Sequence, residues 1–282
     1  MGIKTKIEWC DGSWSPVTGC LHNCDYCYAR KIAKRFSYQG QTLDAPIELQ
    51  QQWLDDGGIA LRKNGCHVLR EPVYLKDSGR KCPYPFEFMP TFHKYRLNEP
   101  QHWRKPRNIF VCSMADLFGD WVPDDWIKEV FDACEKAPQH RYLFLTKNPD
   151  RYQKLYEKNL IPKGNHAYNK WYGCTITNPD DPYLWVDEDA LGIDHYGFLS
   201  IEPLLSDFPL YGNLPQCIRW IIIGAETGNR KNKVIPKKEW VEHICETADK
   251  FGVKVFMKDS LIPIMGEDNM RREYPWEQES GE

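Results

Sequence analysis

Three cysteines near the N-terminus have the spacing that an iron–sulfur cluster requires. Cys20, Cys24 and Cys27 form a C-x3-C-x2-C pattern, and the aromatic residue Tyr26 directly precedes the last of them. Thiolates are the usual ligands of such clusters. Because only three stand on this short segment, they predict a [4Fe–4S] cluster in which one iron has no protein ligand and can bind a reactive molecule.

Two other interpretations of these cysteines stay open. A structural zinc site normally takes four ligands, which usually come as two pairs of closely spaced Cys or His. No second pair is evident, because Cys66 and Cys82 lie too far apart, although His22 or Cys10 could supply a fourth ligand. The remaining interpretation is a set of ordinary, unligated thiols.

The cysteine pattern resembles the signature of the radical S-adenosylmethionine (SAM) superfamily. In that superfamily SAM binds the open iron, and an electron from the cluster cleaves it to methionine and a 5′-deoxyadenosyl radical that abstracts hydrogen from a substrate. The resemblance implies two cofactors, a [4Fe–4S] cluster and SAM, with Cys20, Cys24 and Cys27 as the metal ligands. It also implies an electron donor, a flavodoxin or a ferredoxin.

Short apolar segments alternate with helical sequence along most of the chain. They lie at residues 14–19, 109–114, 142–146, 171–177, 197–201, 220–224 and 254–257. Several are continuously apolar, which is typical of parallel strands buried on both faces. Helices that open at Pro123, Pro149 and Pro236 fall between them. The alternation predicts an α/β fold, a partial (β/α) barrel with about six to seven parallel strands.

We expect one domain over residues 1–282. Residues 41–107 break the alternation, because they are rich in Pro, Gly and basic residues and have no clear period. They predict an insertion after the first helix that packs over the mouth of the barrel. The polar residues 261–282 predict a C-terminal extension.

Polar side chains follow most of the predicted strands. In (β/α) barrels the functional groups gather at the carboxyl ends of the strands. The residues at those ends are Ser113, Asp116, Thr146, Lys147, Ser200, Glu202, Glu226, Lys258 and Asp259. Charges in such places are partly desolvated and need a partner or a ligand. The sequence leaves open whether these residues simply neutralise one another.

The superfamily resemblance suggests which groups contact SAM. Most radical SAM proteins have a Gly-Gly-Glu-type segment after the second strand, which accepts a hydrogen bond from the SAM amine. This chain lacks it, and Ser113 and Asp116 are expected to replace it. The contacts to the SAM ribose and carboxylate are expected from Thr146, Lys147, Ser200 and Glu202. Tyr26 is expected to pack against adenine, with plain core packing as its alternative.

Residues near the last strands are expected to act on the substrate. Glu226 lies in the segment GAETG (224–228), where glycines let the backbone approach a ligand closely. This segment is not the dinucleotide-binding fingerprint. The candidate catalytic residues are Glu226, Lys258 and Asp259, and the candidate substrate contacts are Trp14, Phe118, Glu226 and Lys258. The two aromatic rings are expected to stack on a base.

A closer resemblance extends over nearly the whole chain. It rests on the segments WSPVTGC (14–20), IFVCSMADLFG (109–119), LFLTK (143–147), LSIEPLL (199–205) and GAETG (224–228), in this order. They resemble a phage-associated branch of radical-SAM-like proteins found in phages and bacteria. One activity associated with proteins of this kind is queuine lyase, which releases the cyclopentenediol side chain from the 7-deazaguanine base queuine. The resemblance implies a lyase that breaks a C–N or C–C bond.

The overall charge favours a small substrate over nucleic acid. The 282-residue chain has a formal net charge of −3, whereas proteins that grip a phosphate backbone normally present a net basic face. We therefore expect a radical SAM enzyme that acts on a small nucleobase-like molecule such as queuine. The alternatives are a radical SAM enzyme that modifies or repairs DNA or RNA, and a zinc-stabilised binding module without enzymatic activity.

The composition also bears on location. No run approaches the roughly eighteen apolar residues that a membrane helix needs, and the N-terminus has no apolar region typical of a signal peptide. Eleven cysteines without an export signal fit a reducing compartment. We expect a cytoplasmic protein without a membrane partner.

Overall fold

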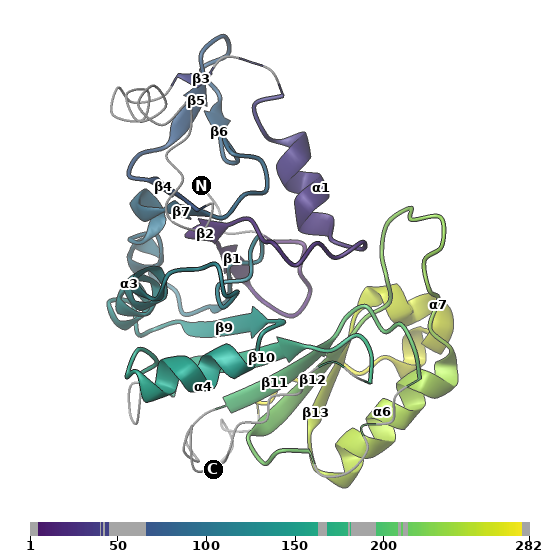
Figure 1. The fold of residues 1–282 in the computed structure, drawn as a ribbon. Helices are drawn as coiled ribbons and strands as arrows, with labels where there is room; N and C mark the ends of the chain where they lie inside the picture. Colours follow the sequence, from purple (N-terminus) through teal and green to yellow (C-terminus); the bar gives the residue numbers. More distant parts are fainter. Residues whose placement is uncertain are drawn as a thin grey trace.

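A seven-stranded parallel sheet forms the centre of the protein (Figure 1). The computed structural model describes residues 5–39, 41, 43–44, 66–162, 168–179, 181, 196–207, 210 and 214–277. In spatial order the strands are β1 (Gly12–Trp14), β8 (Asn108–Val111), β9 (Arg141–Thr146), β10 (Lys170–Thr175), β11 (Tyr196–Ile201), β12 (Ile218–Ile223) and β13 (Lys254–Met257). The predicted partial (β/α) barrel is confirmed.

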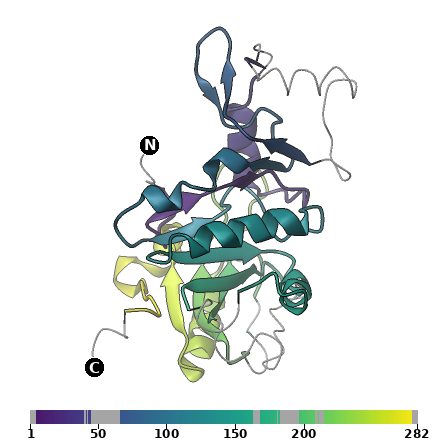
Figure 2. The ribbon, with the colours of Figure 1, turned by 90° about the vertical axis from the view of Figure 1, so that its left-hand side faces the viewer.

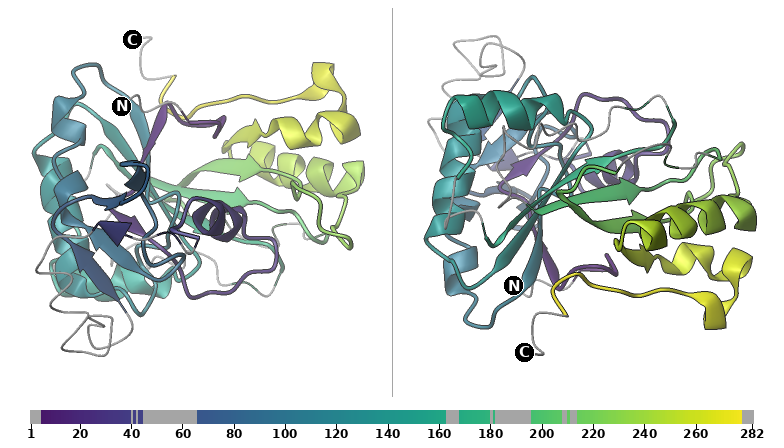
Figure 3. Two further views of the ribbon diagram at one scale, coloured as in Figure 1. Left: turned by 90° about the horizontal axis from the view of Figure 1, so that it is seen from above. Right: turned by 90° about the horizontal axis from the view of Figure 1, so that it is seen from below.

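All neighbouring strands of this sheet are parallel, so their carboxyl ends share one edge. Alternate residues of each strand face opposite sides. One side packs against α3 (Asp124–Glu135), α4 (Asp150–Glu157) and α6 (Lys238–Lys250) in a single large core. In Figure 3 the sheet runs as an open arc, with α3 and α4 outside one half and α6 outside the other.

The other side of the sheet carries large aromatic and aliphatic side chains. This inner cluster consists of Trp9, Phe110, Leu143, Trp171, Phe198, Trp220, Ile222 and Phe256. Tyr274 and Trp276 of the C-terminal segment pack against it. The same segment pairs with β13, since the Met257 N–H donates to the Arg271 carbonyl at 2.8 Å. Tyr274 and Trp276 therefore cover part of the inner face of the sheet.

The chain forms two small sheets between β1 and β8 of the main sheet. One contains β2 (Val17–Thr18), β7 (Thr91–His93) and β4 (His67–Leu69), and the other contains β3 (Leu43–Asp44), β5 (Val73–Leu75) and β6 (Lys81–Cys82). Figures 1 and 2 both show the second of them standing at one end of the molecule. Much of the predicted 41–107 insertion falls here, although residues 45–65 lie outside the described residues.

One predicted strand is wrong in its extent. The apolar run 14–19 was expected to be a single strand that leads into the cysteines. It is divided at Pro16, so that β1 belongs to the main sheet while β2 pairs with β7. Proline removes a backbone donor and is poorly tolerated inside a sheet, which explains the break. The cysteines therefore follow a strand of the small sheet.

Two further helices lie near the ends of the chain. α1 (Tyr28–Arg35) follows the cysteines directly, and α7 (Ile262–Met265) lies near the C-terminus. Short 3-10 turns are η1 (Lys94–Arg96), η2 (Pro100–His102), η4 (Asp259–Leu261) and η5 (Glu267–Asn269). Among the residues that the structure describes, no helix is both long enough and apolar enough to cross a membrane.

Candidate active site

The cysteine loop (residues 19–27) is anchored at both ends. The Gly19 N–H donates to the Met114 carbonyl at 2.8 Å, and the Cys20 N–H donates to the Phe88 carbonyl at 3.2 Å. At the other end, the Cys27 Sγ accepts a hydrogen bond from the Arg30 N–H at 3.4 Å and so caps α1. The loop is therefore held above the carboxyl end of β8, where the predicted site lies.

Gly19 fits this close approach because it has no side chain. Its φ is +85°, in the left-handed region, and a Cβ there would collide with the carbonyl group of Met89. Only glycine combines that backbone conformation with such a small volume. The residue immediately before the first cysteine is therefore fixed by the neighbouring backbone.

The three cysteines are half-buried and none is in a disulfide. Burial, together with the nearby charges of Asp116, Cys24 and Cys27, raises the pKa of Cys20 to about 12. Cys20 and Cys27 pack against a small apolar cluster that includes Phe88. A buried thiolate needs a compensating cation. This donor set suits an iron–sulfur cluster, whose irons would supply that charge.

Within the described part of the chain, no three His, Cys, Asp or Glu side chains converge on a point that could hold a single metal ion. The three cysteine side chains nevertheless interact with one another electrostatically, as the pKa of Cys20 indicates. The structure thus places the three cysteines on one loop, and among the described residues they do not surround a single point as the ligands of one ion would.

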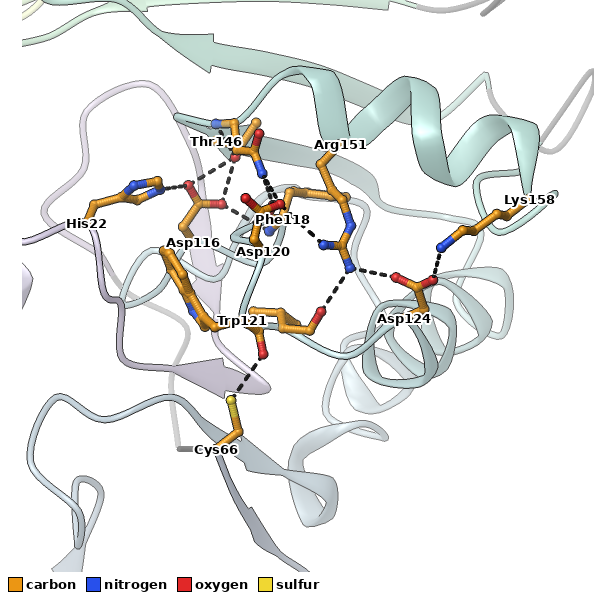
Figure 4. Close-up of polar contacts among 12 residues, drawn as sticks. His22, Cys66, Asp116, Phe118, Asp120, Trp121, Asp124, Thr146, Arg151 and Lys158 are labelled. Atoms are coloured by element: carbon orange, nitrogen blue, oxygen red, sulfur yellow. Dashed lines mark hydrogen bonds and ion pairs between the residues drawn. The ribbon is translucent and has the colours of Figure 1, made fainter. Parts of the chain in front are cut away.

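Asp116 is the centre of a hydrogen-bond network below the cysteine loop (Figure 4). Its Oδ1 accepts from the Thr146 hydroxyl at 2.7 Å and from the Phe118 N–H at 3.0 Å. Its Oδ2 accepts from the Lys147 N–H at 2.9 Å and pairs with the His22 Nε2 at 2.8 Å. Because protein groups engage both oxygens and the side chain is buried, the predicted SAM-amine contact is not open to it.

The same network fixes the segment after β8. Thr146 accepts at 2.9 Å from the Asn148 N–H, and the Asn148 amide donates to the Phe118 carbonyl at 3.0 Å. Further along, Arg151 pairs with Asp124 at 2.5 Å (Figure 4). The ends of β8 and β9 and the cysteine loop are thus joined through buried polar contacts.

Tyr26 and Lys147 come together as a pair at the site. The Lys147 Nζ lies 5.4 Å from the centre of the Tyr26 ring, which is within the range of a cation–π contact. Burial raises the pKa of Tyr26, while Lys147 and Thr177 interact with its hydroxyl and lower it. This places an aromatic ring of the cysteine loop against the ends of β9 and β10.

Glu202 and Lys258 form an ion pair across β12. They follow β11 and β13, and Gly224, at the end of β12, lies between them. A Cβ on Gly224 would be 3.1 Å from the Lys258 Cδ and 3.2 Å from the Glu202 Cγ, so glycine leaves room for the pair. Neither side chain is fully covered, with 14% and 26% of the Lys258 and Glu202 side chains exposed. Part of each side chain therefore stays accessible to solvent.

Glu226 is occupied by a partner within its own loop. Arg230 donates from Nε and from a terminal nitrogen to the two carboxylate oxygens, each at 2.7 Å. The Arg230 hydrogen bond lowers the pKa of Glu226. A substrate group would have to displace Arg230, so the predicted substrate contact of Glu226 requires that this ion pair open.

Several other predicted residues lie away from the site. Trp14 and Phe118 are fully buried in the large core, where the Trp14 Nε1 donates to the Arg96 carbonyl at 2.9 Å. Their rings therefore offer no free face for a base. Asp259 pairs with Arg272 of the C-terminal segment and is mostly exposed. Ser200, in contrast, is buried on β11 two residues before Glu202.

Three polar residues that form contacts at the site were not assigned these contacts from the sequence. His22 was considered only as a zinc ligand, yet it links the cysteine loop to Asp116. The Tyr28 hydroxyl donates to the Ser113 carbonyl at 2.9 Å, which makes the carbonyl of Ser113 a structural contact. Arg230 was not singled out. The position of His22 between two cysteines was the available signal.

Comparison with known families gives one match that covers most of the chain. Residues 4–262 match the family described as protein of unknown function, DUF5131. The chain belongs to the DUF5131 family. No curated protein matches this DUF5131 chain.

Solved structures resemble this DUF5131 protein over most of its length. A cysteine-to-serine variant of spore photoproduct lyase has a TM-score of 0.50 at 11% identity, and the match covers 92% of this chain and 80% of that chain. A tyrosine-to-phenylalanine variant of the same enzyme has a TM-score of 0.51 at 10% identity, with 91% and 78% covered. At such low identity the likeness establishes the fold alone.

Proposed function

We propose that this DUF5131 protein is a radical SAM enzyme whose substrate is a nucleic acid. The observation that carries the proposal is the position of Cys20, Cys24 and Cys27, on one loop at the carboxyl edge of a parallel partial barrel. The fold likeness to spore photoproduct lyase, a radical SAM enzyme, supports the superfamily. A bound cluster with SAM would supply a 5′-deoxyadenosyl radical.

Under the proposal, residues of this chain perform three tasks. Cys20, Cys24 and Cys27 hold the cluster. His22 and Asp116 fix the loop that carries them. Tyr26 with Lys147 borders the site on one side, and Lys258 with Glu202 borders it on the other. The two pairs offer an aromatic face and charged groups, which suit the adenine and the methionine part of SAM.

The choice of substrate changes from the one that net charge favours. A small base such as queuine was the leading expectation, and DNA or RNA was the alternative. Spore photoproduct lyase acts on a DNA lesion, and its fold matches this chain. Trp14 and Phe118, the two rings expected to hold a free base, are buried in the core. Both observations favour the nucleic-acid alternative.

The test is a comparison of substrates by their effect on SAM cleavage. Reconstituted protein would be incubated anaerobically with dithionite and SAM, alone or with single-stranded, duplex or ultraviolet-damaged oligonucleotides, or with queuine and related 7-deazaguanine bases. We expect an oligonucleotide to raise the rate of 5′-deoxyadenosine formation and to be altered itself. Stimulation by queuine with release of its side chain, and none by any oligonucleotide, would contradict the substrate assignment.

A further inference from the structure

Helix α1 presents a stripe of large apolar side chains to solvent. Tyr28 and Ile32 lie four residues apart on one face of the helix, and Phe36, four residues further, is its C-cap residue. They are 48%, 37% and 43% exposed, while Ala29 and Ala33, next to them around the helix, are buried. Two of the three are aromatic. The apolar side of α1 is therefore only partly covered, and its exposed rings lie next to the polar face that a surface helix normally has.

The same helix is strongly basic. It contains Arg30, Lys31, Lys34 and Arg35 and no acidic residue. None of the four forms an ion pair within the described part of the chain, and the Arg35 guanidinium lies 5.5 Å from the centre of the Phe36 ring. α1 is thus a basic element in a protein whose formal net charge is −3.

A second basic segment follows β12. The loop of residues 227–237 contains Arg230, Lys231, Lys233 and Lys237 and no acidic residue. Arg230 is neutralised by Glu226. The three lysines are exposed, and we find no carboxylate paired with them among the described residues.

The two basic segments flank the cysteine loop. α1 begins at its N-cap residue Cys27, and the charge of Asp25, in the same loop, acts on Arg230. Figure 1 shows α1 and the 227–237 loop rising on the side of the molecule toward which the strands of the main sheet point. A ligand at the site would therefore lie between two positive segments, one of which carries exposed rings.

We propose that α1 and the 227–237 loop form a nucleic-acid-binding surface at the mouth of the site. Their lysines and arginines would contact backbone phosphates, and Tyr28 and Phe36 would stack on bases. Positive charge that follows a backbone, combined with aromatic platforms, is how proteins bind single-stranded or unpaired nucleic acid. This inference rests on the proposed function, because it identifies how the same site holds its substrate.

Two other partners would fit part of this surface. An acidic electron-carrier protein suits the charge, and a second copy of the chain suits the apolar stripe. Neither accounts for basic residues on both sides of the mouth together with exposed aromatic rings. Nucleic acid accounts for all three features, so it is the partner to which we assign the surface.

The experiment measures the affinity of a fluorescent single-stranded oligonucleotide for the reconstituted protein at several salt concentrations, without SAM or reductant. For the double variant Lys231→Glu/Lys233→Glu we expect affinity to fall about tenfold, and the slope of log affinity against log salt to decrease by about 1.4. For Phe36→Ala we expect a fall of about tenfold with the slope unchanged, because stacking involves no counterion.

A matched control changes the same charges elsewhere. Lys105→Glu/Lys136→Glu alters two exposed lysines outside both segments, and we expect wild-type binding. Equal weakening by the control and the test variant would overturn the proposal, as would unchanged binding by the test variants. A solution mass twice that of one chain, which Phe36→Ala reduces to that of one chain, would also overturn it. So would an oligonucleotide that is displaced by flavodoxin and by no other nucleic acid.

This binding experiment separates the two proposals. Iron content and 5′-deoxyadenosine formation decide whether the protein is a radical SAM enzyme, and they do not depend on the two lysines. Salt-dependent oligonucleotide binding that follows the variants would support the surface even in a protein that cleaved no SAM. Oligonucleotide binding that stays unchanged in both test variants would overturn the surface alone, whereas a wild-type protein that cleaved SAM but bound no oligonucleotide would overturn the nucleic-acid substrate as well.

Discussion

Asp116 shows how the surroundings of a carboxylate determine its task. Its type and its place after β8 made it a reasonable replacement for the missing SAM-amine contact. In the structure, backbone and side-chain donors from three segments use both of its oxygens, and one of them, His22, belongs to the cysteine loop. A carboxylate that is already satisfied gains little from a ligand. Asp116 therefore positions the cysteine loop.

Replacing Asp116 by Asn should loosen the cysteine loop. The amide accepts through one oxygen only and turns N–H groups toward existing donors, so we expect a loss of about 3 kcal/mol in the free energy of unfolding. We also expect faster hydrogen exchange in residues 19–27 than in the rest of the chain. Asp120→Asn is the matched control, because the Asp120 side chain is 77% exposed, and it should change neither quantity. Equal exchange in the two variants would contradict the positioning role.

The main elements were accessible from sequence because local patterns specify them. Continuously apolar runs such as IRWIII (218–223) predicted the strands of the parallel sheet. Proline followed by acidic residues predicted where the outer helices begin. The division of residues 14–19 was not recognised, although Pro16 was its physical cause. The partners of His22 and Glu226 were beyond a local pattern. Asp116 lies far along the chain from His22, and nothing in GAETG shows that Arg230 turns back onto Glu226.

The turn before the first cysteine should tolerate no side chain. Gly19→Ala adds a Cβ that collides with the Met89 backbone at a positive φ, so we expect a loss of about 3 kcal/mol or more in stability. Gly79→Ala is the control, because Gly79 also has a positive φ, +61°, but nothing lies within 4 Å of its Cβ position. It should cost about 1 kcal/mol. Urea unfolding of both variants measures the difference, and similar losses would show that Gly19 is not crowded.

The small sheet beneath the cysteine loop should weaken in acid. Burial lowers the pKa of His93 to about 3 and that of His67 to about 4, from 6.5. Below pH 6.5 the unfolded chain binds protons that the folded chain cannot, so stability should fall with pH by about 1.4 kcal/mol per unit for each histidine. The fall should continue until pH approaches each folded-state pKa. Urea unfolding of the wild type and of His93→Gln between pH 7 and 4.5 tests this.

The variant should show a shallower fall than the wild type. His102, which is exposed, supplies the control change His102→Gln. An identical pH dependence in all three proteins would show that His93 is not held neutral.

At the scale of the whole molecule, the distribution of charge matters more than its sum. The net charge of −3 argued against a nucleic-acid partner. Yet α1 and the 227–237 loop are basic throughout and lie on either side of the cysteine loop. The sequence alone does not show that two segments about 200 residues apart share one edge. The 227–237 loop follows β12 at the carboxyl edge of the parallel sheet, and the hydrogen bond from the Gly19 N–H to the Met114 carbonyl holds the loop before α1 at the same edge.

The central claim is that the cysteine loop holds a cluster that cleaves SAM. The protein would be purified anaerobically, reconstituted with iron and sulfide, and given dithionite and SAM. We predict about four irons per chain and formation of 5′-deoxyadenosine. Ala at Cys20, Cys24 or Cys27 should abolish both, whereas Cys134→Ala, on the buried face of α3, should retain its iron. A colourless protein with one tightly bound zinc, or full activity in Cys20→Ala, would contradict the claim.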